Sequence, residues 1–332
     1  MATSKNVFSP SEFQFAFVAE ANVGTKNATS MQLLNVDDIV TVTQEVTQTT
    51  DPRSSGARTL ATADVFTNDQ GGHLTTITMS VVLDTTVSPL LHSQALAVAV
   101  GSSPASYDLA YNFAPDALIH GGATDITGTC TLAFISPVSN ESKYFTGCRL
   151  TEMTVSYDSG NEGGRARANL TWETHYRPAD GAAAPTTPTA YGGTYRYLRQ
   201  FGTLKQLGGA DIVLNKVEYT ISMPAMGVGF QGTNGDPEFV QVGIPSAGFS
   251  AVLGVKYDDN TAALWESRRA GTTLVLEIAD NATWASATFG IKASFCKITG
   301  DVQPAGADAG VFQDVPLIAT ASTSGDVVQI VP

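Results

Sequence analysis

Residues that commonly carry out chemistry are few in this chain and lie far apart in its sequence. The four histidines are His73, His92, His120 and His175, and the three cysteines are Cys130, Cys148 and Cys296. They form no HExxH, CxxC or clustered-histidine pattern. We interpret the histidines as structural and the cysteines as free thiols of a reducing compartment. We therefore predict no enzyme activity, no metal and no cofactor.

Two further patterns invite a chemical interpretation but have simpler explanations. The glycine-rich segment GNEGGRARA at Gly160 lacks the Lys-Ser/Thr pair of a phosphate-binding loop and lies in a predicted hairpin. Acidic residues in DTT at Asp84 and YDDN at Tyr257 lie where a strand meets a helix, and there they suit helix N-caps. Two acids suited to glycoside hydrolysis can converge in space without a sequence signature, so that alternative stays open.

The elements that must position these residues belong to a folded chain with a sparsely charged surface. It has 332 residues, 43% hydrophobic and 15% charged, and a net charge of −13. The length favours two domains, and the acidity disfavours tight binding to nucleic acid. The sequence has no recognisable signal peptide and no apolar stretch that could span a membrane. Such a surface suits a protein that packs against copies of itself.

Alternating apolar and polar residues predict a mainly β fold. The predicted strands are 37–47, 73–83, 128–136, 148–157, 167–176, 211–222, 248–257, 272–278, 289–298 and 315–321. Only two segments predict helices. In the first, 85–100, Thr86 or Ser88 is the expected cap. In the second, 259–271, the expected cap is Asp259 or Asn260, and Gly271 ends the helix.

An internal repeat is the most informative feature of the sequence. CRLT at Cys148 matches CKIT at Cys296, and SVVLDTTVSPLLHSQALA matches GVKYDDNTAALWESRRAG, which places Asp84 opposite Asp258. LLNVDDIVTV likewise matches VLNKVEYTIS. We predict a first domain over 1–175 with an insertion at about 104–127, a linker over 176–209 and a second domain over 210–332. A shared structural rhythm without common ancestry is the alternative.

The strand–helix–strand unit followed by CKITGDV and GVFQDVPLIAT resembles the tail tube protein (major tail protein) of long-tailed, siphovirus-like bacteriophages. The resemblance implies two tandem β-sandwich or barrel domains, each with one flanking α-helix. It also implies that three chains form a pseudo-sixfold homotrimeric ring, and that rings stack into a hollow tube in the virion tail.

The same resemblance implies partners and a location. The partners are copies of the chain and other tail proteins, namely the tape measure, tail terminator and distal tail proteins. Viral double-stranded DNA passes through the lumen without specific binding, no membrane is involved, and assembly takes place in the host cytoplasm. Carboxylates that face the bore would repel the phosphates of that DNA.

Two long polar loops are the expected ring-to-ring contacts, because this hairpin arm reaches the next ring in the family. They are 46–64 and 222–239, with mobile surface loops as the alternative. The hypothesised contact residues are Thr49, Asp51, Arg53, Arg58, Gly229, Asn234 and Asp236.

The joint between the repeats concentrates arginine and tyrosine residues. The hypothesised inter-subunit residues there are Arg177, Tyr195, Arg196, Tyr197 and Arg199. A nucleic-acid-binding stretch and a solvated linker are the alternatives.

Two other functions compete with the tube. One is another phage structural protein, such as a distal tail, connector or capsid component. The other is a β-sandwich module that binds a receptor. Both fit a β-rich chain, but neither requires two matched repeats.

Overall fold

The structure is a computed structural model of the chain. It describes residues 12–21, 24–37, 40–46, 48–50, 65–67, 73–96, 109–111, 129–176, 178–224, 226–231, 236–240, 248–259, 261, 263–300, 312–319 and 328–332. The fold is mainly β, as predicted, with two α-helices among the described residues.

Among its described residues, the N-terminal half contains eleven strands and one helix. They are β1 (Gln14–Ala19), β2 (Gln32–Leu34), β3 (Thr41–Val46), β4 (Gln48–Thr50), β5 (Val65–Thr67), β6 (His73–Val82), α1 (Val87–Leu96), β7 (Leu109–Tyr111), β8 (Thr129–Ile135), β9 (Ser142–Asp158), β10 (Arg167–Thr174) and β11 (Ala179–Ala182). Alternation explains the clearest of them: β10 buries Ala168, Leu170 and Trp172 on one face.

The C-terminal half follows a similar order. It contains β12 (Leu204–Leu207), β13 (Ala210–Asp211), β14 (Leu214–Ser222), β15 (Met226–Gln231), β16 (Asp236–Val240), β17 (Gly248–Lys256), α2 (Leu264–Ala270), β18 (Leu274–Ala279), β19 (Gly290–Ile298), β20 (Phe312–Ala319) and β21 (Val328–Val331). Short 3₁₀ turns lie at Leu198–Gln200 and Trp284–Ser286.

Antiparallel pairing gives both halves the same strand order. The first strand set runs β2-β1-β8-β9-β10-β6-β3, with β11 also paired to β9. The second strand set runs β13-β12-β18-β19-β20-β17-β14, with β21 also paired to β19. Each set has a helix between corresponding strands, α1 after β6 and α2 after β17.

An irregularity in the pairing also recurs. The β8–β9 register shifts between Cys130 and Leu132, and the β18–β19 register shifts between Leu274 and Leu276. Cys130 lies opposite Cys148, and Leu274 lies opposite Cys296. β-Bulges re-aim side chains at defined positions, so a bulge at matching positions is a specific point of similarity.

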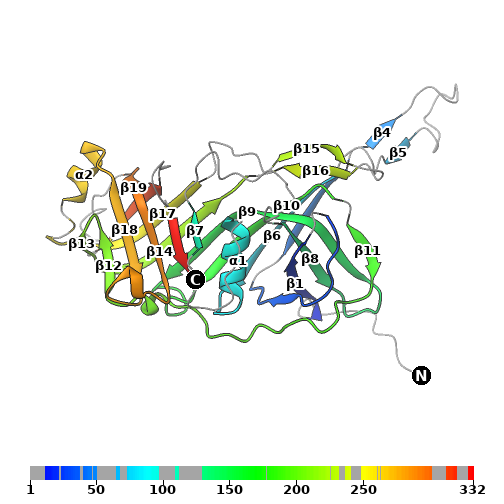
Figure 1. The fold of residues 1–332 in the computed structure, drawn as a ribbon, viewed down its shortest axis with the longest axis horizontal. Helices are drawn as coiled ribbons and strands as arrows, with labels where there is room; N and C mark the ends of the chain where they lie inside the picture. Colours follow the sequence, from blue (N-terminus) through cyan, green and yellow to red (C-terminus); the bar gives the residue numbers. More distant parts are fainter. Residues whose placement is uncertain are drawn as a thin grey trace.

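The two strand sets join into one sheet with one main core. Residues Glu152–Asp158 of the long strand β9 pair with Lys216–Ser222 of β14. The main cluster of buried side chains runs from Phe17 to Ile330 and includes both helices. Figure 1 shows α1 near the middle of the molecule and α2 at one end.

The predicted linker contains ordered strands. β11 pairs with β9, and β12 pairs with β18. Between these strands, Thr186 and Thr189 form parallel bridges with Thr29 and Gln32. The predicted boundaries at 176 and 209 stay a prediction. β11, Thr186 and Thr189 lie against the first strand set, whereas β12 belongs to the second.

The helix ends correct two sequence expectations. The Asp84 carboxylate accepts hydrogen bonds from the backbone N–H groups of Thr86 and Val87, both at 2.8 Å, which confirms the N-cap role expected for the acid of the DTT pattern. The alternative expectation, a cap at Thr86 or Ser88, is wrong. The cap expected at Asp259 or Asn260 is wrong, because α2 begins at Leu264 after Ala263, which has no side-chain oxygen. Gly271 ends α2 in the left-handed region with a φ of 63°, as predicted.

Candidate functional site at the junction of the two strand sets

In the described part of the chain, the buried cysteine thiols and the buried Glu20 carboxylate serve structural purposes. Burial raises the pKa of the Cys130 and Cys148 thiols well above their usual range, which disfavours the reactive thiolate. Glu20 is a buried carboxylate whose pKa is also raised by burial. It accepts hydrogen bonds from backbone N–H groups of Gly24 and Gly147, both at 2.9 Å, and from the hydroxyl of Thr131 at 2.8 Å. Glu20 therefore ties β1 to β8 and β9.

Two further absences hold for the described residues. No three His, Cys, Asp or Glu residues gather there in a way that could hold a metal ion. None of the described helices combines the length and apolarity that a membrane crossing requires.

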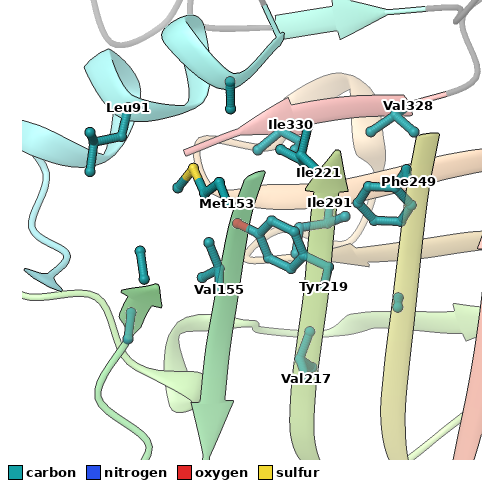
Figure 2. Packing of buried hydrophobic residues seen from close by; sticks show 14 of the residues in the cluster. Leu91, Met153, Val155, Val217, Tyr219, Ile221, Phe249, Ile291, Val328 and Ile330 are labelled. Atoms are coloured by element: carbon teal, nitrogen blue, oxygen red, sulfur yellow. The ribbon is translucent and has the colours of Figure 1, made fainter. Parts of the chain in front are cut away.

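We define the junction as the contact of α1 with β9 and β14. It contains a buried series of hydrogen-bonded polar groups, called the polar chain below. The His92 ring on α1 contacts the Tyr219 hydroxyl on β14 through Nε2 at 2.6 Å. Its Nδ1 lies 2.7 Å from the Ser88 carbonyl oxygen. Because a carbonyl only accepts, Nδ1 carries the proton, and the Tyr219 hydroxyl donates to Nε2. Figure 2 shows Tyr219 between strands, with its hydroxyl directed toward β9.

The polar chain continues to β9 and is electrostatically neutral. Tyr219 also hydrogen-bonds Tyr157, and burial raises the pKa of both phenols above their usual value. Burial lowers the pKa of His92 to about 4, and this value includes a smaller contribution of the same sign from the nearby Arg196 guanidinium. His92 is fully buried, so the neutral imidazole is the form that this junction holds.

Arg196 is the joint residue that reaches the junction. Its guanidinium lies 4.6 Å from the ring centroid of Phe289 and donates to the Pro332 carbonyl oxygen. Its backbone bonds to Leu83 and Ala166, at 3.1 and 2.8 Å. Arg196 therefore has partners within its own chain, and its predicted contact with a neighbouring chain stays a prediction.

The other joint residues lie close to Arg196. Tyr195 forms a bridge with Asp84, and Tyr197 forms one with Arg165. The exposed Arg199 stacks on Tyr197, with its guanidinium 5.0 Å from the ring centroid. Arg177 lies outside the described residues.

The predicted ring-to-ring loops are described only in part. Thr49 lies in β4, Gly229 in β15 and Asp236 in β16, so each loop carries a two-stranded hairpin. Figure 1 shows both hairpins along the same border of the molecule. Asp51, Arg53, Arg58 and Asn234 lie outside the described residues.

The sheet has one face that does not contribute to the core. We call it the outer face; it is formed by the side chains of β3, β6, β10, β9, β14, β17 and β20 that alternate with core residues. It carries many hydroxyl and amide groups, from Thr41, Thr43, Thr76, Thr78, Ser80, Asn169, Thr171, Thr154, Ser156, Thr220, Ser222 and Ser250.

Carboxylates outnumber cations on the outer face. The carboxylates belong to Glu45, Glu152, Asp158, Glu173, Glu218 and Asp314, and the cations to Arg167, Lys216 and Lys256. This face is therefore acidic across the junction, where the hydroxyl oxygens of Thr154 and Thr220 lie 2.9 Å apart. It is more apolar over β17 and β20, where Val252, Pro316 and Ile318 lie on it.

No protein-family model matches this chain, and a search of curated protein sequences also finds no match. Interpretation of the function therefore depends on the repeat, the junction and the outer face.

Proposed function

We propose that this chain is the structural subunit of a hollow tube, the tail tube of a long-tailed bacteriophage. Each chain then supplies two tube domains, and three chains form a ring with pseudo-sixfold symmetry. The observation that carries the proposal is the strand order that occurs twice and is joined edge to edge through β9 and β14. A unit that binds its own repeat by one edge is suited to bind further copies head to tail, and such contacts close into rings.

The recurrence supports a true duplication in several independent ways. The two strand sets share their pairing order, the place of their helix, a hairpin in the same connection and the bulge that follows Cys130 and Leu274. Sequence similarity alone left a shared rhythm as an alternative. Common registers at matching residues are much harder to reach without common ancestry.

We assign the outer face to the bore of the tube. Its hydroxyl groups are neutral, and its excess of carboxylates repels phosphate groups, so DNA passes without being held. Both described helices lie away from this face, because α1 packs in the core and α2 borders β19. A reconstruction with Glu152 and Glu218 on the outside of a tube would contradict this assignment.

Electron microscopy of the purified full-length chain at increasing protein concentration tests the proposal. We expect hollow tubes of uniform width built from stacked rings. Discrete compact particles without a bore would instead favour a receptor-binding module or a connector component.

A further inference from the structure

The two helices occupy matching positions but have very different surroundings. In α1, every residue except Leu90 is buried. In α2, only Leu264 is buried, and the side chains of Glu266 and Arg269 remain 70% and 64% exposed. The difference follows from the junction, because β14 of the second strand set covers α1 and no described strand covers α2 in the same way.

Strand registers identify which residues correspond at the two helices. Glu173 lies opposite Arg149, next to Cys148, and Ile318 lies opposite Lys297, next to Cys296. Glu173 also pairs with Thr76, as Ile318 does with Ser250. Thr76 therefore corresponds to Ser250. His92 follows Thr76 at the same distance along the sequence as Glu266 follows Ser250, so His92 corresponds to Glu266.

β3 of the first strand set corresponds to β14 of the second. Val42 lies opposite Ile77, and Tyr219 lies opposite Ala251. Because Ile77 and Ala251 correspond, Val42 is the counterpart of Tyr219. The strand registers thus correct the sequence match of LLNVDDIVTV to VLNKVEYTIS, which places Ile39 opposite Tyr219. Tyr219 is 2% exposed and meets His92, whereas Val42 is 43% exposed.

The free edge of β3 offers the backbone groups that β14 uses at the junction. Ser80 and Val82 of β6 bond toward the β3 side, to Asp37 and Asn35. The direction of backbone hydrogen bonds alternates from residue to residue along a strand, so the N–H and C=O groups of Ile77 point toward β10. Val42 lies opposite Ile77, and its N–H and C=O groups therefore point away from β6. Among the described strands, β3 pairs with β6 alone.

We propose that α2 of one chain receives the β3 edge of a second copy, in the arrangement that α1 and β14 have within one chain. This inference rests on the proposed tube and names the contact between its chains. The occupant is a second copy because its β3 matches the strand already seated beside α1. The contact differs in chemistry, because the exposed Glu266 and Arg269 and the half-buried Arg268 border it. Added salt therefore weakens it more than the neutral junction within the chain.

A control position lies outside the contact, in the connection between β8 and β9. Val138 is 40% exposed, and Ala282 in the corresponding β-turn of the second strand set is exposed too. Neither residue is covered by the other strand set, so this turn does not belong to the lateral contact.

Cross-linking between separately purified full-length variants tests the inference. Val42→Cys and Glu266→Cys chains are mixed and treated with a short bismaleimide; the native Cys130, Cys148 and Cys296 are fully buried and do not compete. We expect covalent dimers at roughly ten times the yield of each variant alone or of a Val138→Cys with Glu266→Cys mixture, because contact raises the effective concentration.

Each outcome separates this inference from the proposed function. Tubes with unselective cross-linking overturn the contact and leave the tube proposal in place. Selective dimers without tubes support the contact and count against the tube. Neither tubes nor selective dimers overturn both.

Discussion

Acidification should weaken the folded chain through His92, and the size of the effect follows from its burial. The ring has a pKa of about 4 in the folded chain, against an ordinary value of 6.5. Between these values the unfolded chain binds a proton that the folded chain excludes, so the free energy of unfolding falls as pH falls. The full difference corresponds to roughly 3 kcal/mol, and the part expected between pH 7 and 5 is about 2 kcal/mol.

Urea denaturation of dilute, unassembled chain at pH 7, 6 and 5 measures this effect. His92→Gln removes the titrating ring, so this variant should lose about 2 kcal/mol less than the parent chain over that interval. The comparison uses the change with pH, because the substitution itself also alters stability. Equal pH dependence in the two chains would refute the account of the junction.

The carboxyl groups of Glu20 and Glu173 do not imitate the expected trend. Burial raises the pKa of Glu20, so its protonation at low pH favours the folded chain, which is the opposite sign. Glu173 is raised in the same direction by burial. Arg196 remains charged, and the phenols of Tyr157 and Tyr219 remain neutral, because burial raises their pKa.

Three further substitutions test separate parts of the structure. Asp84→Ala removes the acceptor for two backbone N–H groups at the start of α1 and should cost about 1–2 kcal/mol in thermal or urea unfolding; an unchanged stability would contradict the assigned cap. Gly147→Ala should cost roughly 2–4 kcal/mol by the same assay, because φ is 60° there and a Cβ would approach the Tyr176 ring to 2.3 Å; a soluble variant of parental stability would argue against this packing. Val42→Pro should fold normally but fail to form tubes in electron microscopy, whereas Val42→Thr, which keeps the outward N–H group, should form them; tubes from the proline variant would show that the free edge of β3 does not take part in the contact between chains.

The sequence predicted the long elements well, for reasons visible in single segments. RANLTWET alternates strictly and forms β10, and the apolar run after Asp84 forms α1. Short strands such as β7 and β12 escaped prediction, because three or four residues carry too little periodicity. β7 also pairs with β21, far away in the chain, and no local pattern encodes that contact.

The junction was beyond sequence reasoning for a similar reason. His92 was predicted to be a structural histidine, but its partner Tyr219 lies 127 residues away. The only local signal was an imidazole ring in a helix without charged residues. The basic joint was recognised as a distinctive segment, yet the direction of Arg196 toward Phe289 depends on how the second strand set folds back.

The most direct test of the central claim is an image reconstruction of assembled tubes at a resolution that separates strands. We expect three chains per ring, true threefold symmetry and a pseudo-sixfold arrangement of the two strand sets. β7, which occurs once per chain, should appear at every second unit. Six chains per ring in an exact sixfold arrangement, or assemblies without a bore, would contradict the account.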